Sequence, residues 1–255
     1  MNRQSIIAVM MLLAFGAARL TFEQRLSTEL RAAHFHGARL DLDMREQIGQ
    51  MAFLAALSGF RAPVADGLFL HAYTAWENVE WGRMKLDYDA ATSLQPRCEL
   101  FWDTAGWQMA YNASNAAFSD RNQPREALRL KAQREYFKLG EDYFLHGIAN
   151  NPEKPSLYNS LGMLYRDKLK DHCKASDIFK KYSKLSGALT YGERFSAYEL
   201  AQCPGHEREA YEKLVELYNR GENERLPTLL KWIRNLQDTF NIPAEKRINI
   251  PPEKP

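Results

Sequence analysis

Apolar residues recur every three or four positions along nearly the whole chain, which is the spacing of one face of an α-helix. The signals of β-structure (strict alternation, Asn-Gly or Asp-Gly turns, and runs of Val, Ile and Thr) are nearly absent. Proline or glycine interrupts the helical pattern at fairly regular intervals, at Pro96, Pro152 and Pro155, Gly187, Pro204 and Gly205, and Gly221. Each interruption lies between two helical patterns and therefore predicts the end of a helix. The sequence thus predicts an all-α protein.

These patterns divide the chain into four predicted segments. Residues 1–19 form a hydrophobic N-terminal segment, and residues 20–64 form an amphipathic helical lead-in. Residues 65–240 contain the regularly interrupted helices. Residues 241–255 end in a proline-rich run, so we expect an extended tail there, because proline cannot continue a regular helix.

The N-terminal segment predicts a membrane-anchored or exported protein. Its uncharged apolar run, Ile6–Ala18, has 13 residues, whereas a membrane-spanning helix needs about 20. The basic start at Arg3 and the small residues before Arg19 resemble a secretory signal peptide cleaved after Ala18. The alternative is a retained anchor, in which Arg3 and Arg19 reach to the membrane surfaces. We favour the periplasmic side; a buried N-terminal helix of a cytoplasmic protein is the third interpretation.

Two stretches of the chain share a register relative to their prolines. Six positions after Pro96 and Pro152 lies an aromatic residue, and ten positions after each lies a glycine: Trp102 and Tyr158, then Gly106 and Gly162. Small, aromatic and small residues also precede Pro152 at helical spacing: Gly140, Phe144 and Gly147. The shared register indicates a repeated helical unit.

This register resembles that of the tetratricopeptide repeat (TPR) family, whose unit of about 34 residues is a helix–turn–helix. The residues that match its two helices best are Tyr158, Leu161, Gly162 and Tyr165 for the first, and Gly140, Phe144, Gly147 and Pro152 for the second. After Tyr165 the pattern resumes one residue late, at Ala175 and Phe179. The resemblance implies a right-handed superhelical stack of hairpins, an α-solenoid, with an insertion near residues 112–135.

The glycines inside predicted helices need an explanation, because glycine in a helix costs roughly 1 kcal/mol relative to alanine. In the repeats that this sequence resembles, the two helices of a unit cross closely. We therefore expect Gly106 and Gly162 to lie at helix crossings, opposite small residues of the paired helix. Closer packing there would offset the propensity cost.

Composition and cysteines narrow the functional classes. The formal net charge of +2 gives no reason to expect a nucleic-acid-binding face, and 45% apolar residues argue against disorder. The three cysteines, Cys98, Cys173 and Cys203, leave two states open. One disulfide plus a free thiol fits an oxidising compartment, and three buried thiols fit the cytosol; we favour the buried thiols.

The sequence contains no established catalytic or metal-binding motif. His34 and His36 would point to different faces of a helix, and Cys203 with His206 offers too few ligands for a metal. We therefore expect no enzyme, no cofactor and no metal site. An enzyme without a recognisable motif, or a helical-repeat protein that binds nucleic acid or an anionic surface, remains an alternative.

The TPR resemblance implies a concave groove lined by the first helix of each unit. The positions carried over to this chain are Phe69, Tyr73 and Trp76, then Asp103, Trp107 and Tyr111, and then Asn159, Met163 and Arg166. Large amphipathic side chains in a groove suit an extended peptide or a partner helix. Plain core packing is the alternative role for the aromatic residues. The sequence thus predicts a non-catalytic scaffold for an unidentified protein partner, with a possible membrane contact through its N-terminal segment.

Overall fold

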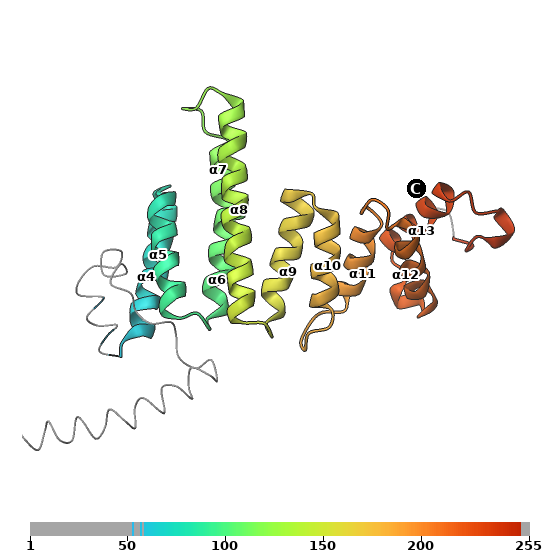
Figure 1. Cartoon of the computed structure of the whole chain (residues 1–255), viewed down its shortest axis with the longest axis horizontal. Helices are drawn as coiled ribbons and strands as arrows, with labels where there is room; N and C mark the ends of the chain where they lie inside the picture. Colours follow the sequence, from blue (N-terminus) through green and yellow to red (C-terminus); the bar gives the residue numbers. More distant parts are fainter. Residues whose placement is uncertain (1–52, 54–56, 58, 251–255) are drawn as a thin grey trace, which may run out of the picture. The chain divides into compact units, whose positions relative to one another are not determined.

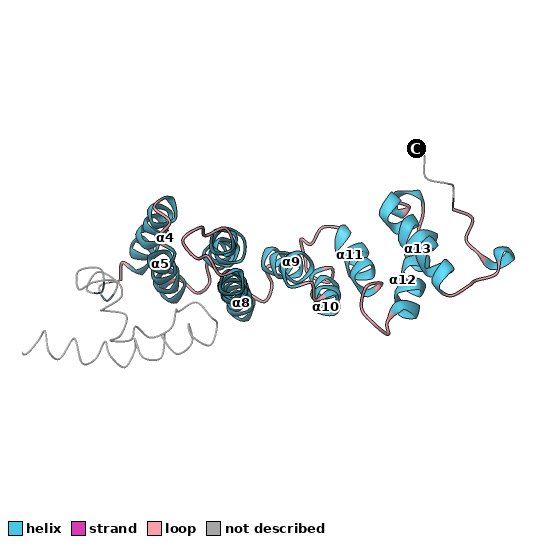
Figure 2. Ribbon diagram, turned by 90° about the horizontal axis from the view of Figure 1, so that it is seen from above, coloured by secondary structure: helices cyan, strands magenta, loops and turns pink. Residues whose placement is uncertain are grey.

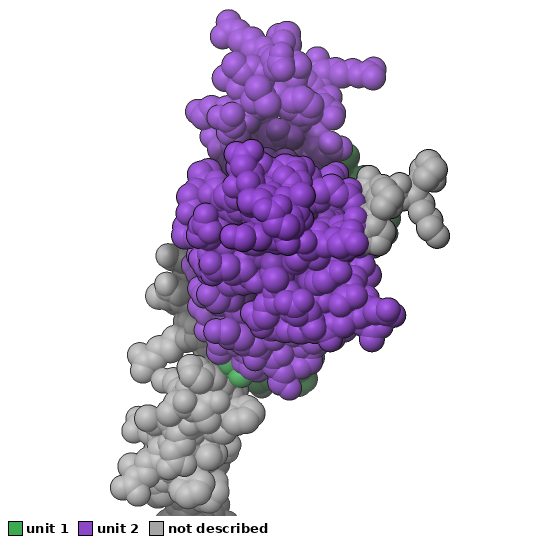
Figure 3. All heavy atoms as spheres, turned by 90° about the vertical axis from the view of Figure 1, so that its right-hand side faces the viewer, with its two compact units in different colours: residues 1–98 green, residues 99–255 purple. Residues whose placement is uncertain are grey.

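The computed structural model describes residues 53, 57 and 59–250, and all regular secondary structure in this part of the chain is helical (Figures 1 and 2). The chain divides into two compact units, Met1–Cys98 and Glu99–Pro255, which are coloured separately in Figure 3. The prediction of an all-α protein is confirmed for these residues. The predicted signal or anchor segment, most of the lead-in and the last five residues lie outside them. No helix in the described ranges is both long and apolar enough to cross a bilayer.

The described part of the first unit is a helical hairpin. Its helices are α4 (Arg61–Glu77) and α5 (Trp81–Leu94). Alanines 65, 72 and 75 are the buried residues of α4, so the helix presents a small-residue stripe that lets α5 approach closely. The α5 side of the contact supplies larger side chains, including Met84 and Tyr88, which are almost fully buried.

The second unit contains the remaining helices. In chain order these are α6 (Glu99–Trp107), the π-helical η1 (Gln108–Ala113), α7 (Ser114–Phe118), α8 (Glu126–Asn150), α9 (Pro155–Leu164), the π-helical η2 (Tyr165–Leu169), α10 (His172–Tyr182), α11 (Tyr191–Leu200), α12 (Glu207–Asn219), the 3₁₀ turn η3 (Glu222–Glu224), α13 (Pro227–Thr239) and the 3₁₀ turn η4 (Ala244–Lys246). From α8 to α13, each α-helix packs against the next one in the chain. Short connections between neighbours produce this arrangement.

Helix boundaries in the second unit follow the predicted interruptions. Pro155 opens α9 at its first position, where the missing N–H costs nothing. Gly187, Gly205 and Gly221 lie between helices with positive φ angles of 81°, 85° and 138°, a backbone region that favours glycine. The side chain of Asp171 caps α10 by accepting a hydrogen bond from the backbone N–H of Lys174 at 3.0 Å.

The residues predicted as an insertion, 112–135, lengthen one hairpin. They continue the helix that starts as α6 through η1 and α7, turn at residues 119–125, and form the first part of α8. Figure 1 shows the ends of α7 and α8 extending beyond the neighbouring helix α9.

The predicted glycine crossings are present, and the expected small partner is found for Gly106, whereas Gly162 meets an aromatic ring. A Cβ atom on Gly106 would lie 2.6 Å from the ring of Phe144, and one on Gly162 would lie 2.8 Å from the ring of Phe179. Both glycines therefore face an aromatic ring of the paired helix, and Gly106 also faces a small residue. A Cβ atom on Gly140 of α8 would lie 2.6 Å from the Ala110 Cβ and 2.8 Å from the backbone oxygen of Gly106. The glycines thus allow both aromatic and small residues of the facing helix to approach closely.

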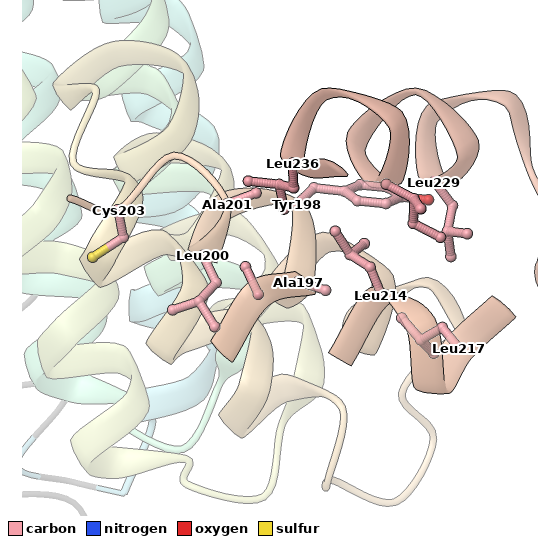
Figure 4. Packing of buried hydrophobic residues seen from close by; sticks show 11 residues of the cluster. Ala197, Tyr198, Leu200, Ala201, Cys203, Leu214, Leu217, Leu229 and Leu236 are labelled. Carbon is pink, nitrogen blue, oxygen red and sulfur yellow. The ribbon is translucent and has the colours of Figure 1, made fainter. Parts of the chain in front are cut away.

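The C-terminal helices share a hydrophobic cluster. Figure 4 shows side chains of α11, α12 and α13 gathered in it, including Tyr198, Leu214 and Leu229. Isoleucines 248 and 250 of the predicted tail pack against the same cluster, although only η4 is helical beyond α13. The described part of the tail is therefore held against the domain.

A disulfide joins Cys173 in the first turn of α10 to Cys203 in the turn after α11. The favoured prediction of three buried thiols was therefore wrong for this pair, while Cys98 is a free cysteine. Beside the disulfide, Nδ1 of His172 lies 2.7 Å from Oε2 of the buried Glu199. The disulfide and the His172–Glu199 contact thus both connect the N-terminal end of α10 to the C-terminal end of α11.

Candidate interaction surface

Six of the nine predicted groove residues lie in the second unit, on α6–η1 and α9–η2. We refer to them as the α6–α9 face: Asp103, Trp107, Tyr111, Asn159, Met163 and Arg166. The other three, Phe69, Tyr73 and Trp76, lie on α4 in the first unit.

The α6–η1 part of this face is an aromatic pair with a basic neighbour. Trp107 and Tyr111 are four residues apart and therefore lie on one side of the helix. Their rings stack with centroids 5.7 Å apart and an interplanar angle of 16°. The Nζ of Lys168 lies 4.9 Å from the centroid of the Tyr111 ring, a cation–π arrangement. Trp107 remains 48% exposed, so the pair keeps apolar surface open to solvent.

Burial is the main reason why the pKa of Tyr111 rises to about 12, and the negative charge of Asp167 adds to the effect. The phenol therefore stays protonated at neutral pH and can act as a hydrogen-bond donor.

Both π-helical segments fall on this face. Tyr111 lies in η1, and Arg166 and Lys168 lie in η2. A π-helical turn holds more residues than an α-helical turn, because its hydrogen bonds run from i to i+5. Such segments are frequent at functional sites.

The α9–η2 part of the face is held by residues of α11. The hydroxyl of Tyr191 donates a hydrogen bond to Oδ1 of Asn159 at 2.8 Å. The Arg166 guanidinium donates two hydrogen bonds to the Asp167 carboxylate, at 2.7 and 3.1 Å, and lies 5.2 Å from the ring centroid of Phe195. The groove prediction missed Tyr191 and Phe195; their four-residue spacing on the next helix is the signal that could have included them.

Asp103 lies at the contact between α6 and α9. Burial raises the pKa of its carboxyl group, a hydrogen bond with Ser160 lowers it, and the nearby charge of Glu99 raises it again. Its Oδ1 atom is buried without a hydrogen-bond partner. Asp103 therefore belongs more to the helix–helix contact than to a surface open to a ligand.

The three groove residues of α4 differ in exposure. The Phe69 ring packs against the ring of Tyr88 on α5, with centroids 5.8 Å apart, so it belongs to the hairpin core. Tyr73 is 53% exposed, and its ring lies 5.2 Å from that of Trp76. Tyr73 is therefore the member of this group that presents most of its surface.

The predicted repeat-packing residues lie mainly at helix contacts. Leu161 and Gly162 are buried on α9. The hydroxyl of the buried Tyr165 donates to Oε1 of Glu141 on α8 at 2.7 Å. Tyr158 is only half-buried, and its hydroxyl donates to the carbonyl of Pro152 at 3.1 Å, which ties α9 to the preceding turn.

A separate charged cleft of about 250 Å³ lies between α10, α11 and α12. Its lining includes Lys180, Lys184 and Arg220, and Arg220 forms ion pairs with Glu193 and Glu216. None of the predicted groove residues contributes to it. Within residues 53, 57 and 59–250, no three His, Cys, Asp or Glu side chains are grouped as a metal site.

No known protein family, curated protein or solved structure matches the chain.

Proposed function

We propose that the protein is a non-catalytic interaction scaffold, in which a TPR-like array of helices binds a segment of a partner protein through the α6–α9 face. The observation that carries this proposal is the stacked pair Trp107 and Tyr111, which keeps exposed apolar surface next to a basic group. Tryptophan, tyrosine and arginine are the residues that most often dominate the energy of protein interfaces.

The glycine contacts support the repeat interpretation. Gly106 meets Phe144 and Gly162 meets Phe179, so two helix pairs use the same glycine-on-aromatic packing. The separations along the chain differ, 38 residues against 17, because the lengthened hairpin lies between the first pair. Equivalent packing with different connections fits two related units, one of which carries an insertion.

The polar residues of the α6–α9 face are proposed to hold its shape rather than to contact the partner. Asn159 and Arg166 are occupied by Tyr191 and Asp167, respectively. They therefore fix the surface in shape, while Trp107, Tyr111 and the half-buried Met163 supply contact area. A preformed surface lowers the entropy cost of binding an extended segment.

The disulfide supports the proposed export of the domain. Structural disulfides persist in oxidising compartments and are rare in the cytosol of most organisms. The bond between Cys173 and Cys203 thus fits a domain on the periplasmic side of a membrane, with residues 1–19 as signal or anchor.

The test is affinity capture from the native host with wild-type protein and the variant Trp107→Ala/Tyr111→Ala. Leu145→Ala/Leu189→Ala is the matched control, because it removes two exposed apolar side chains elsewhere in the second unit. Circular dichroism must first show that all three proteins are folded. We expect the aromatic variant to lose partners that the control retains. Identical partner lists for all three proteins would refute the α6–α9 face as the binding surface.

A further inference from the structure

The end of the lengthened hairpin is a basic and partly apolar projection. We define the hairpin end as residues 114–138, which comprise α7, the turn at 119–125 and the first half of α8. The helix α7 packs against α8 and η1, and Figure 1 shows this end extending beyond α9. Its position suits contact with another surface.

The hairpin end carries an excess of positive charge. Residues 119–138 contain six Lys or Arg and three Asp or Glu, a net charge of +3, whereas the whole chain has +2. The basic residues are Arg121, Arg125, Arg129, Lys131, Arg134 and Lys138. The hairpin end is therefore one of two clearly basic stretches of the chain; the other, residues 166–184, has seven Lys or Arg and three Asp.

Several of these cations are not neutralised within the fold. Lys131 lies 3.8 Å from Glu135 and Lys138 lies 3.4 Å from Asp142, so these two lysines are paired. Arg129 donates to the carbonyl of Gln123 at 2.8 Å. Arg121 and Arg125 lie in the turn and have no ion pair in the described part of the chain. Arg125 is also the N-cap residue of α8 without a capping hydrogen bond, so its side chain is not needed to close the helix.

Exposed apolar side chains lie beside these cations. Phe118, the last residue of α7, is 40% exposed, and Leu128 in the first turn of α8 is 42% exposed. Arginines next to exposed apolar residues are the combination that binds the interface of an anionic bilayer. The apolar groups enter the headgroup region, and the guanidinium groups pair with lipid phosphates.

We propose that the hairpin end binds the surface of an anionic phospholipid membrane. A basic residue near such a surface contributes about fivefold in affinity, so Arg121 and Arg125 together contribute about 30-fold. This binding is separate from the α6–α9 face and does not depend on its function. It would hold the second unit near the membrane by a second contact in addition to the N-terminal segment.

The test uses the full chain with an environment-sensitive fluorophore on Asn122→Cys, in a Cys98→Ser background that leaves the disulfide intact. The label lies in the turn of the hairpin end, so its emission reports that location however the N-terminal segment behaves. The protein is reconstituted with vesicles of phosphatidylcholine alone or mixed with phosphatidylglycerol. We expect a blue shift only with the anionic vesicles, and its loss at about 1 M salt, where the Debye length is about 3 Å.

Two charge-reversal variants test whether the membrane binds the hairpin end itself or responds only to the net charge of the protein. Arg121→Glu/Arg125→Glu should abolish the blue shift, with at least about a 30-fold loss of apparent affinity for the anionic vesicles. The control Lys180→Glu/Lys184→Glu makes the same charge change at exposed positions in and just after α10 and should retain the shift. Equal emission with both kinds of vesicle, or loss of the shift in both variants, would overturn the proposal. Capture of an acidic protein instead, with no response to lipid, would also overturn it.

Discussion

Gly140 offers the strictest test of the close helix crossings. A Cβ atom at this position would lie 2.6 Å from the Cβ of Ala110, 2.8 Å from the backbone oxygen of Gly106 and 3.0 Å from the backbone nitrogen of Ala110. Ordinary contacts of a Cβ atom begin at 3.4 Å, so Gly140→Ala forces α8 away from α6–η1 by about 0.8 Å. Backbone atoms cannot rotate aside as a side chain can, and the helices themselves must move.

The change in the free energy of unfolding caused by Gly140→Ala is the sum of two opposing contributions, helix propensity and overpacking. Alanine improves helix propensity by roughly 1 kcal/mol, whereas overpacking of a tight contact costs about 1–3 kcal/mol. Gly67→Ala on α4 is the matched control, because its Cβ would meet nothing within 4 Å. The propensity gain is common to both substitutions, so the difference in the free energy of unfolding isolates the overpacking cost of about 1–3 kcal/mol.

The assay is thermal unfolding followed by circular dichroism, with urea unfolding as a second measurement. For a chain of this size, 1 kcal/mol corresponds to about 2–4 °C in Tm. We expect Gly67→Ala to raise Tm and Gly140→Ala to have a Tm lower than that control by about 2–12 °C. If Gly140→Ala stabilises the protein as much as the control does, α6 and α8 do not cross as closely as described, and the explanation of the helical glycines fails.

Three further predictions concern single contacts. Tyr165→Phe removes the hydrogen bond to Glu141, and urea unfolding should show a loss of about 1–3 kcal/mol, because the acceptor is charged; an unchanged midpoint would contradict this. Cys173→Ser/Cys203→Ser opens a loop with a sequence separation of 30 and should cost about 3–4 kcal/mol, a loss that dithiothreitol should reproduce in the wild type but not in the variant. Burial raises the pKa of Asp103 above 3.8, so the folded state holds this proton more tightly than the unfolded state. The contribution of Asp103 to stability therefore declines as the pH rises from about 4 through the raised pKa. Asp103→Asn should flatten that part of the stability–pH curve, and an unaltered curve would show that Asp103 does not titrate there.

The helices and their ends could be predicted from the sequence because the signals are local. Pro155, Gly187 and Gly205 lie at boundaries since proline lacks an N–H group and glycine tolerates positive φ. The crossing glycines Gly106 and Gly162 could be predicted in position as well, because glycine inside a helix needs a compensating contact.

Other features depend on residues far apart in the chain and could not be predicted in this way. Phe144 meets Gly106 across 38 residues, and no local pattern indicates which side chain fills the crossing. The disulfide requires Cys173 and Cys203 to be brought together by the packing of α10 on α11.

The candidate surface was predictable in part. The positions carried over from the TPR resemblance placed Trp107 and Tyr111 on one predicted face, and their rings are stacked in the structure. The resemblance could not show that Phe69 turns into the core of its hairpin. Nor could it show that Lys168 lies over Tyr111, because this contact depends on the π-helical segment η2.

The disulfide also keeps the two parts of the chain covalently joined after backbone cleavage between α10 and α11. Cys173 and Cys203 close a ring that contains the exposed connection between α10 and α11, around Gly187. A protease that cleaves this connection leaves both fragments covalently joined, and they separate on a gel only after reduction. The same geometry makes the connection a suitable place for new termini in a circularly permuted protein, because the ring already holds the two helices in register.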